Sequence, residues 1–401
     1  MKFFVSLLLC ISIMFLPVSA ATLSSEYIDD DLFTPLPVSS APTEKIGQVL
    51  ELKAKSVILL EPKTMQVLYE SNSDEKLAPA SITKIMSLLL VVEAIEEGHL
   101  KLTDIITASE YACSMGGSQI WLEPGEQMSV DDLLKASFIA SANDTTVALA
   151  EAVAGSEEAF VVLMNEKAAL LGMTNTTFKN TTGLDAEGHL TTAHDVALMS
   201  AELIKHEMVK NYSTIWMDSL RDGKSELVNT NKLVRFYEGC TGLKTGTTST
   251  AGYCLSATAE RDGMSLVAVV MKGDSSADRF EAARKLLNYG FANYNFQHID
   301  YDMSTPLSVA VKGGTMPRTE LVADEGIDVL LKKTDRAGIT QNLVLPEYID
   351  APVKAGDTVG TVYVCSGENQ IGIINLKAKN SVPKLSFGFT FKALLCALFT
   401  M

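Results

Sequence analysis

The sequence predicts an α/β protein of the α+β type: an antiparallel sheet with helices on both faces and a long helical insert, followed by a small β-sandwich-like domain. Three observations predict this class. The chain has 401 residues, more than the roughly 250–300 that one hydrophobic core usually reaches. Strand-like segments lie on either side of a long stretch of helical periodicity. After about residue 294, short alternating segments are separated by Gly, Pro and Asp.

The N-terminus has the pattern of a secretory signal. Lys2 precedes an apolar run, and Val18-Ser19-Ala20 supplies a small-residue cleavage site. Residues 1–20 are therefore expected to be a signal peptide, and the protein to be exported. The alternative, an uncleaved membrane anchor, is disfavoured because the apolar run is short. Residues 21–45, with Ser, Thr, Pro and an acidic "EYIDDD", are expected to form a flexible leader.

The first folded domain is expected over residues 46–293. "KSVILLEPKTMQVLYE" predicts a β-hairpin that turns at Glu61-Pro62-Lys63-Thr64. Helical periodicity then dominates from Ile82 to about Val209. Strand character returns in "GCTGLKTGTTSTAGYCLSATAE" and "MSLVAVVMKG", and "ADRFEAARKLLNYGF" predicts a closing helix.

Residues 294–383 predict a small all-β domain with a spacer or docking role, because no group of chemically reactive residues stands out in it. Residues 384–401 end the chain with large apolar side chains at helical spacing and only two lysines. The segment is shorter than the ~20 residues that span a bilayer, so an amphipathic helix lying on the membrane surface is expected. Burial of this helix in a homodimer is the alternative.

Charge and cysteine content exclude several classes. The formal charge of −16 and a pI near 4.8 leave no basic face for nucleic acid. Five scattered histidines give no metal-ligand pattern, and no motif demands an organic cofactor. Free buried thiols are expected beyond the signal peptide, and a Cys240–Cys254 disulfide across a hairpin stays open as an alternative.

Three short motifs carry the chemistry. Ser81-Ile-Thr-Lys84 opens a helix, Ser141-Ala-Asn143 lies in the helical insert, and Lys244-Thr-Gly246 lies on a predicted strand. The first motif alone is weak, because Ser81 could be a helix cap and the S-x-x-K spacing recurs at Ser73 and at Ser381. Their order and context together favour a catalytic site.

The three-residue spacing of Ser81 and Lys84 suits a serine nucleophile with a lysine base. Residues i and i+3 share a helix face, so Lys84 can take the proton of Ser81 if burial and the charge of Lys244 lower its pKa. The helix N-terminus and the backbone N–H of Thr247 could stabilise an oxyanion. Ser141 could pass the proton to the leaving group.

The remaining motif residues are expected to bind substrate. Asn143 could hydrogen-bond a substrate amide, and Lys244 with Thr245 could meet a terminal carboxylate. Gly246, without a side chain, would let an extended substrate pair with the strand.

The three motifs together resemble those of penicillin-recognising serine acyl-enzymes. Longer stretches, among them "IWLEPGEQMSVDDLLKASFIASANDTTVALAE" and "GLKTGTTSTAGYCLSATAERDGMSLVAVVM", resemble the D-alanyl-D-alanine carboxypeptidases, the low-molecular-mass penicillin-binding proteins of the S11 peptidase family. The resemblance implies a β-lactamase/transpeptidase-like catalytic domain and a Ser81 acyl-enzyme formed with peptidoglycan stem peptides ending in D-Ala-D-Ala, or with β-lactam antibiotics. It also implies a location on the outer face of a bacterial cytoplasmic membrane.

Two positions extend or depart from the family pattern. Arg279 resembles an arginine that holds the substrate carboxylate, and a surface helix arginine is the alternative. Many members have His after Lys-Thr-Gly, where this chain has Thr247. Because the role there is mainly that of the backbone, little effect on acylation is expected.

Two other functions stay open on the sequence. A class A β-lactamase shares the motifs, but such enzymes usually have Ser-Asp-Asn where this chain has Ala142, and they need neither the second domain nor the apolar tail. A β-lactam or peptidoglycan sensor that is acylated and stops there is the non-enzymatic alternative.

Overall fold

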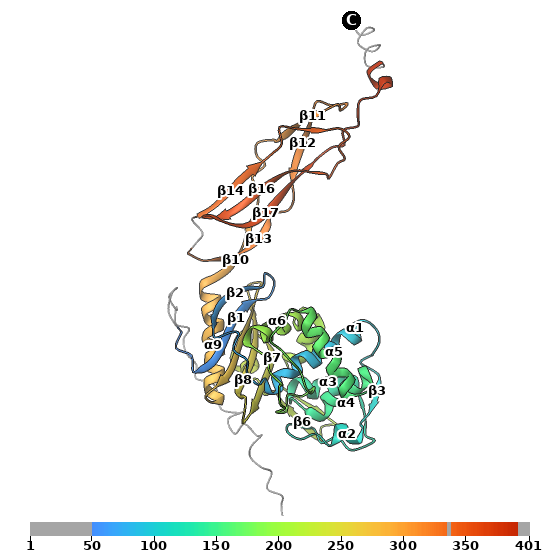
Figure 1. Cartoon of the computed structure of the whole chain (residues 1–401), viewed down its shortest axis with the longest axis vertical. Coiled ribbons are helices and arrows are strands. Elements are labelled where there is room, and N and C mark those ends of the chain that lie inside the picture. The colour runs from blue at the N-terminus through green and yellow to red at the C-terminus, as the bar shows by residue number, and fades with distance from the viewer. Residues whose placement is uncertain (1–49, 335–337, 392–401) are drawn as a thin grey trace, which may run out of the picture.

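The computed structural model describes residues 50–334 and 338–391. The predicted signal peptide and leader, and residues 392–401 of the tail, lie outside these residues. The described chain forms a mixed α/β body and an elongated β region that extends from it beyond helix α9 (Figure 1). The fold class predicted from the sequence is confirmed.

A five-stranded antiparallel sheet is the centre of the first body. Its order is β2-β1-β9-β8-β7, which places β7 at one edge. The strands are β1 (Ala54–Glu61), β2 (Gln66–Ser71), β7 (Cys240–Thr248), β8 (Gly252–Arg261) and β9 (Met264–Gly273). Strands β1 and β2 form the hairpin predicted around Pro62.

Both faces of this sheet are buried. Alternate side chains of β1 point to opposite faces, so Val57 and Leu59 enter one core cluster while Ile58 and Leu60 enter another. Helix α9 (Ser276–Asn293) packs on the first face. Helix α6 (Ala193–Leu203) packs on the second. The strands therefore consist of nearly continuous apolar runs rather than alternating ones.

The helical insert connects β2 to β7. It contains η1 (Ala80–Thr83), α1 (Lys84–Glu96), α2 (Glu110–Cys113), α3 (Val130–Ile139), α4 (Asn143–Ala154), α5 (Glu157–Leu170), α6, η2 (Glu207–Val209), α7 (Lys210–Ser213) and α8 (Leu233–Phe236), with the two-stranded ribbons β3 (Ile105–Thr107)–β4 (Gln127–Ser129) and β5 (Met217–Leu220)–β6 (Ser225–Val228). Hydroxyl side chains cap several helices: Ser129 accepts from the backbone N–H of Asp132, and Ser156 accepts from that of Ala159.

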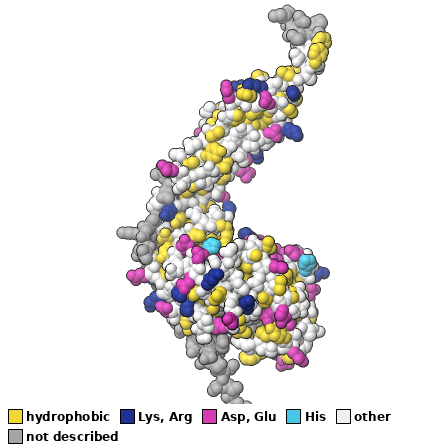
Figure 2. Space-filling view, viewed as in Figure 1, with side chains coloured by type: hydrophobic (Ala, Val, Ile, Leu, Met, Phe, Trp, Pro, Cys, Tyr) yellow, Lys and Arg dark blue, Asp and Glu magenta, His cyan; other side chains and the backbone are white. Residues whose placement is uncertain are grey.

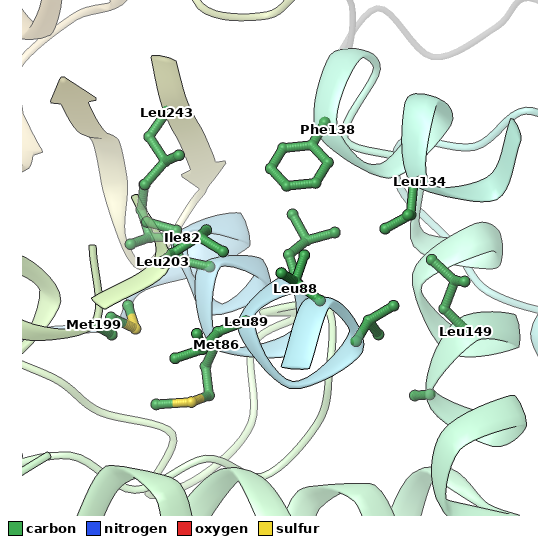
Figure 3. Close-up of a cluster of buried hydrophobic side chains, with 14 of the residues drawn as sticks. Ile82, Met86, Leu88, Leu89, Leu134, Phe138, Leu149, Met199, Leu203 and Leu243 are labelled. Atoms are coloured by element: carbon green, nitrogen blue, oxygen red, sulfur yellow. The ribbon is translucent and has the colours of Figure 1, made fainter. Parts of the chain in front are cut away.

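Helix α1 lies in the middle of the insert. Its side chains Met86, Leu88 and Leu89 are buried against helices α3, α4 and α6 (Figure 3). Because apolar residues surround it, α1 is a rigid support for the residues at its N-terminus. Those residues are Ser81 and Lys84.

The second body is all β. A six-stranded sheet has the order β14-β16-β17-β12-β11-β15, and β10 pairs with β13. The strands are β10 (Tyr294–Ile299), β11 (Ser308–Lys312), β12 (Arg318–Ala323), β13 (Ile327–Lys332), β14 (Ile339–Val344), β15 (Tyr348–Asp350), β16 (Thr358–Ser366) and β17 (Asn369–Ala378). Strand β10 follows α9 directly, and Leu330 of β13 packs into the core cluster beneath α9.

The cysteines of the described residues are free thiols, as expected, but only Cys254 is buried, whereas Cys113, Cys240 and Cys365 are partly exposed. The alternative Cys240–Cys254 disulfide is wrong, because Cys240 pairs with Ala259 and Cys254 pairs with Gly246 in the β7–β8 ladder. The two sulfurs therefore belong to different cross-strand pairs.

The C-terminal tip of the described chain is apolar. A helix covers residues 387–391, and the stacked rings of Phe387 and Phe391 are 86% and 54% exposed. Figure 2 shows hydrophobic side chains at this end of the described chain. Over the ranges 50–334 and 338–391, no helix has the length and apolar character needed to cross a bilayer.

Candidate active site

Ser81 and Lys84 meet at the junction of η1 and α1. The sequence predicts Ser81 at the start of an α-helix, whereas the structure places it one turn earlier, in the four-residue 3₁₀-helix η1. Side chains at i and i+3 eclipse in a 3₁₀-helix. The Nζ of Lys84 accordingly lies 2.9 Å from the Oγ of Ser81.

Lys84 is fully buried, and this changes its acid–base behaviour. Burial lowers the pKa of Lys84 well below its ordinary value of 10.5, and the positive charge of Lys244 lowers it further, while the carboxylate of Asp144 opposes both. The Nζ also donates to the backbone carbonyl of Thr182 at 2.9 Å. The lowered pKa favours the neutral amine, and a neutral amine in this place beside the Ser81 hydroxyl would have the properties of a general base.

The second motif lies in the connection between α3 and α4. Ser141 adopts a left-handed backbone conformation with φ 61°, and its hydroxyl accepts from the Nζ of Lys244 at 2.6 Å. Burial lowers the pKa of Lys244 to about 7, and the nearby Arg279 guanidinium adds to this effect. Lys244 can therefore hold or release a proton near neutral pH, and the Ser141 hydroxyl is in contact with it.

Asn143 is the first residue of α4, and only the nitrogen of its side-chain amide has a hydrogen-bond partner among the described residues. Its Nδ2 donates to the carbonyl of Gly116 at 2.5 Å, and its backbone N–H donates to the carbonyl of Ser118 at 2.6 Å. Its Oδ1 is buried and has no partner among the described residues. A buried acceptor without a partner is costly, so this oxygen is suited to receive an N–H from a ligand.

Strand β7 brings the third motif to the sheet edge. Lys244 and Thr245 are buried, and the Thr245 hydroxyl donates to the Oγ1 of Thr230 at 2.7 Å. Thr247 is exposed, and the Arg279 guanidinium donates to its Oγ1 at 2.8 Å and to the carbonyl of Gly246 at 3.3 Å. Arg279 is 4% exposed, so it is not the surface arginine of the alternative interpretation.

The structure shows a reason for glycine at position 246 that differs from the one expected, namely a close contact with η1. A Cβ at Gly246 would lie 2.9 Å from the backbone N of Ser81 and 3.0 Å from the backbone O of Pro79. The missing side chain makes room for η1. Strand β7 and the Ser81 backbone can therefore come close enough to surround one oxyanion position.

Sequence reasoning missed three contributors. Thr182 acts through its carbonyl, and Asp144 acts through a buried carboxylate that accepts from the backbone N–H of Leu122 at 3.0 Å. At Gly183, where φ is 87°, a Cβ would lie 1.8 Å from the carbonyl of Ala80. The Thr182 carbonyl and the Gly183 contact could not be recognised in the sequence, because neither depends on a distinctive side chain. Asp144 was detectable as the acidic neighbour of Asn143.

Fold and site together define a serine acyl-enzyme of the penicillin-recognising class, with a mixed α/β catalytic body and a separate β region. The model of the D-alanyl-D-alanine carboxypeptidase family matches residues 41–275, which is more than half of the chain. The C-terminal domain model of penicillin-binding protein 5 matches residues 303–384. The chain belongs to the S11 family of D-alanyl-D-alanine carboxypeptidases.

Curated relatives agree with this assignment. The chain is 42% identical over 339 residues to D-alanyl-D-alanine carboxypeptidase DacF of Bacillus subtilis, covering 84% of this chain and 87% of that protein. It is 36% identical to D-alanyl-D-alanine carboxypeptidase DacC of Escherichia coli, covering 82% and 84% respectively.

Solved structures share the fold. Penicillin-binding protein 5 of Haemophilus influenzae aligns with a TM-score of 0.72 at 29% identity, over 84% of this chain and 99% of that one. Penicillin-binding protein D2 of Listeria monocytogenes, solved with ampicillin bound, aligns with a TM-score of 0.54 at 32% identity. It covers 61% of this chain and 100% of its own.

Proposed function

We propose that the protein is a serine-type D-Ala-D-Ala carboxypeptidase that removes the terminal D-alanine from peptidoglycan stem peptides through a Ser81 acyl-enzyme. The observation that carries the proposal is the 2.9 Å contact between the Oγ of Ser81 and the buried Nζ of Lys84. Membership in the carboxypeptidase family supports the choice of substrate.

Acylation begins when Ser81 attacks the carbonyl carbon of the penultimate D-alanine. The Ser81 proton passes to the neutral amine of Lys84, and the backbone N–H groups of Ser81 and Thr247 stabilise the oxyanion. The peptide C–N bond breaks as the hydroxyl of Ser141, which contacts Lys244, gives its proton to the departing D-alanine amine. Ser141 regains the proton that Lys84 received, so Lys84 is neutral again and, on balance, the proton of Ser81 ends on the leaving amine. Water then hydrolyses the ester, which restores Ser81 and releases the shortened peptide.

Substrate recognition falls to the residues around this centre. The unpartnered Oδ1 of Asn143 would accept an N–H of the stem peptide. Lys244, Thr245 and Arg279 would hold the terminal carboxylate beside the edge of β7. Gly246 lets the strand and η1 approach each other, as its close contact with the Ser81 backbone supports.

A peptide cleavage assay tests the function. The full chain is incubated with an acylated tripeptide that ends in D-Ala-D-Ala, and free D-alanine is measured. Release of D-alanine supports the carboxypeptidase, whereas a stable penicillin adduct without release would indicate the sensor. Fast nitrocefin hydrolysis would indicate the β-lactamase, which neither the family match nor the second domain favours.

Location is a further part of the proposal. We infer an exported enzyme in which residues 1–20 are the signal peptide, 21–45 the leader, 46–293 the catalytic domain and 294–383 a β-domain that separates the catalytic site from the membrane. Residues 384–401 would lie on the membrane surface. The exposed rings of Phe387 and Phe391 support this placement.

Truncation tests the anchor. The full chain and a form ending at residue 383 are mixed with lipid vesicles and sedimented. If residues 384–401 anchor the protein, only the full chain should sediment with the vesicles. If both forms sediment equally, the anchor is wrong, and if only the full chain is a dimer in solution, the tail is a dimer contact.

A further inference from the structure

Glu157 places a buried carboxylate just behind the catalytic residues. It is the first residue of α5 and is 7% exposed. Its Oε1 accepts from the backbone N–H of Thr181 at 2.8 Å and from the Thr181 hydroxyl at 2.6 Å, and its Oε2 accepts from the hydroxyl of Tyr111. Burying a carboxylate costs several kcal/mol unless hydrogen bonds compensate. Three such bonds meet that requirement here.

The backbone that Glu157 holds is the one that contacts Lys84. Thr182, the next residue, accepts from the Nζ of Lys84 through its carbonyl at 2.9 Å. On the other side, the carbonyl of Thr181 accepts from the hydroxyl of Ser87 at 2.7 Å. Since Ser87 lies three residues after Lys84 on α1, the segment is held between helices α1 and α5.

Contacts within the segment fix it further. The Oδ1 of Asn180 accepts from the backbone N–H groups of Thr182 at 3.2 Å and Gly183 at 2.7 Å. Gly183 lies directly against the carbonyl of Ala80, the residue before the nucleophile. The Thr182 carbonyl therefore has little freedom to move relative to Ser81 and Lys84.

We propose that Glu157 is a positioning residue for the base: it holds the Thr181–Thr182 backbone so that the Thr182 carbonyl orients the Lys84 amine toward Ser81. A neutral amine has two N–H donors and one lone pair. When one N–H is given to the carbonyl of Thr182, the lone pair can face the Ser81 hydroxyl at 2.9 Å. This inference rests on the proposed function, because it takes Lys84 as the base.

Position rather than charge is the means of this effect. Glu157 reaches Lys84 through the Thr181–Thr182 backbone and makes no direct hydrogen bond to it among the described residues. A neutral side chain of the same shape should therefore serve. Glutamine keeps an acceptor oxygen for Thr181, and its NH₂ group can donate to the Tyr111 hydroxyl.

The test compares Glu157→Ala, Glu157→Gln and the control Glu158→Ala in the full chain. Glu158 is the exposed neighbour of Glu157 on α5. The rate of Ser81 acylation by a fluorescent penicillin is measured against pH. Glu157→Ala should acylate about 10–100-fold more slowly, since a displacement near 1 Å costs about that much. Glu157→Gln and Glu158→Ala should stay within about threefold of the parent.

The pH profile of the acylation rate distinguishes a displaced Lys84 amine from a general loss of stability in Glu157→Ala. If the Thr182 carbonyl moves away, the Lys84 ammonium loses an acceptor, so the pKa of Lys84 falls and the acid limb of the profile moves to lower pH. A folded Glu157→Ala protein with the parent rate would overturn the inference. A slower protein with an unchanged acid limb would overturn it as well, since that result indicates only a general loss of stability.

A second variant covers the case in which Glu157→Ala does not fold. Thr181→Val removes one donor to Glu157 and keeps the side-chain volume. It should acylate about 3–10-fold more slowly with the same shift of the acid limb, in line with the loss of one hydrogen bond. A parental rate and acid limb in this variant would overturn the inference. If the parent chain itself is not acylated on Ser81, the proposed function fails, which is a different result.

Discussion

The Nζ of Lys244 lies 2.6 Å from the Oγ of Ser141, although 103 residues separate them along the chain. The contact joins the edge strand β7 to the connection between α3 and α4, so it closes one side of the candidate active site. Burial lowers the pKa of Lys244 to about 7, and in the proposed mechanism this lysine supports the proton transfer from Ser141. The proposed mechanism thus uses two lysines, Lys84 beside the nucleophile Ser81 and Lys244 beside Ser141.

A second serine in an S-x-x-K motif, Ser73, provides a matched control for a test of Ser81 as the nucleophile. Ser81→Ala should abolish the mass increase that benzylpenicillin produces on the intact protein, because no other hydroxyl lies beside the buried Lys84 in the described residues. Ser73→Ala, at the other S-x-x-K serine of the first domain, should leave the adduct intact, since Ser73 donates to Glu70 instead. An adduct that survives in Ser81→Ala would identify another nucleophile.

Replacing the base tests the role of Lys84. Lys84→Ala should lower the acylation rate about 10²–10⁴-fold, the usual contribution of a general base. Stopped-flow mixing with a chromogenic β-lactam measures this rate. Lys76→Ala, in the matching position of the Ser73 motif, is the control and should behave as the parent. Acylation at a near-parental rate would remove Lys84 from the mechanism.

Arg279 has two separable effects. Its positive charge contributes to lowering the pKa of Lys244, so Arg279→Ala should raise that pKa and move the basic limb of kcat/KM to higher pH. Loss of a charged donor to the substrate carboxylate should raise KM about 10–100-fold. Arg284→Ala, on the same helix, should change neither quantity, because Arg284 pairs with Glu281. An unchanged KM would exclude Arg279 from carboxylate binding.

Gly246 tests the contact between β7 and η1. Gly246→Ala would place a methyl group 2.9 Å from the Ser81 backbone N, so the strand must shift. We expect acylation to slow about 10–100-fold while the circular dichroism spectrum stays native. Gly338→Ala, in the second body, is the control, because no atom other than those of its chain neighbours lies within 4 Å of its added Cβ. Parental acylation in Gly246→Ala would mean that the strand position is not critical.

Because His189 is buried, we expect the free energy of unfolding to decrease in acid. It is 3% exposed, one ring nitrogen lies 2.9 Å from the Oγ1 of Thr83, and burial lowers its pKa to about 4 from an ordinary value of 6.5. The unfolded chain therefore binds a proton that the folded chain does not between these values, and stability falls as pH drops through this window.

The size of this effect can be measured by urea unfolding. The parent should lose about 3 kcal/mol more unfolding free energy than His189→Gln between pH 6.5 and pH 4. His99→Gln, at an exposed position, should follow the parent. Parallel profiles for the parent and His189→Gln would show that His189 is protonated equally in both states.

The strands and the main helices could be predicted from the sequence because their periodicity is strong. The hairpin at Pro62 and the three strands around Lys244 occur where the apolar runs indicate. The order of the strands could not be predicted, since it depends on how the helical insert separates β2 from β7. That separation makes β7 the edge strand and brings it against η1.

The motif side chains were also visible in the sequence, but the surroundings that give them their properties were not. Nothing in the sequence shows that the Thr182 carbonyl contacts Lys84, since any residue supplies a carbonyl. The left-handed conformation of Ser141 and the contact of Gly246 with η1 likewise follow from tertiary packing. The 3₁₀ turn at Ser81 differs from the predicted α-helix start because Gly183 and β7 restrict the backbone there.

The outermost place of β7 in its sheet has a wider consequence. No strand pairs with the outer side of β7 in the described residues, although its carbonyls at Thr241, Gly242 and Gly246 accept from Ser213, Asn231 and Arg279. An extended chain that pairs with this edge would have to use the remaining backbone groups of β7. A short peptide that docks there without a carbonyl in reach of Ser81 would therefore inhibit without forming a covalent bond.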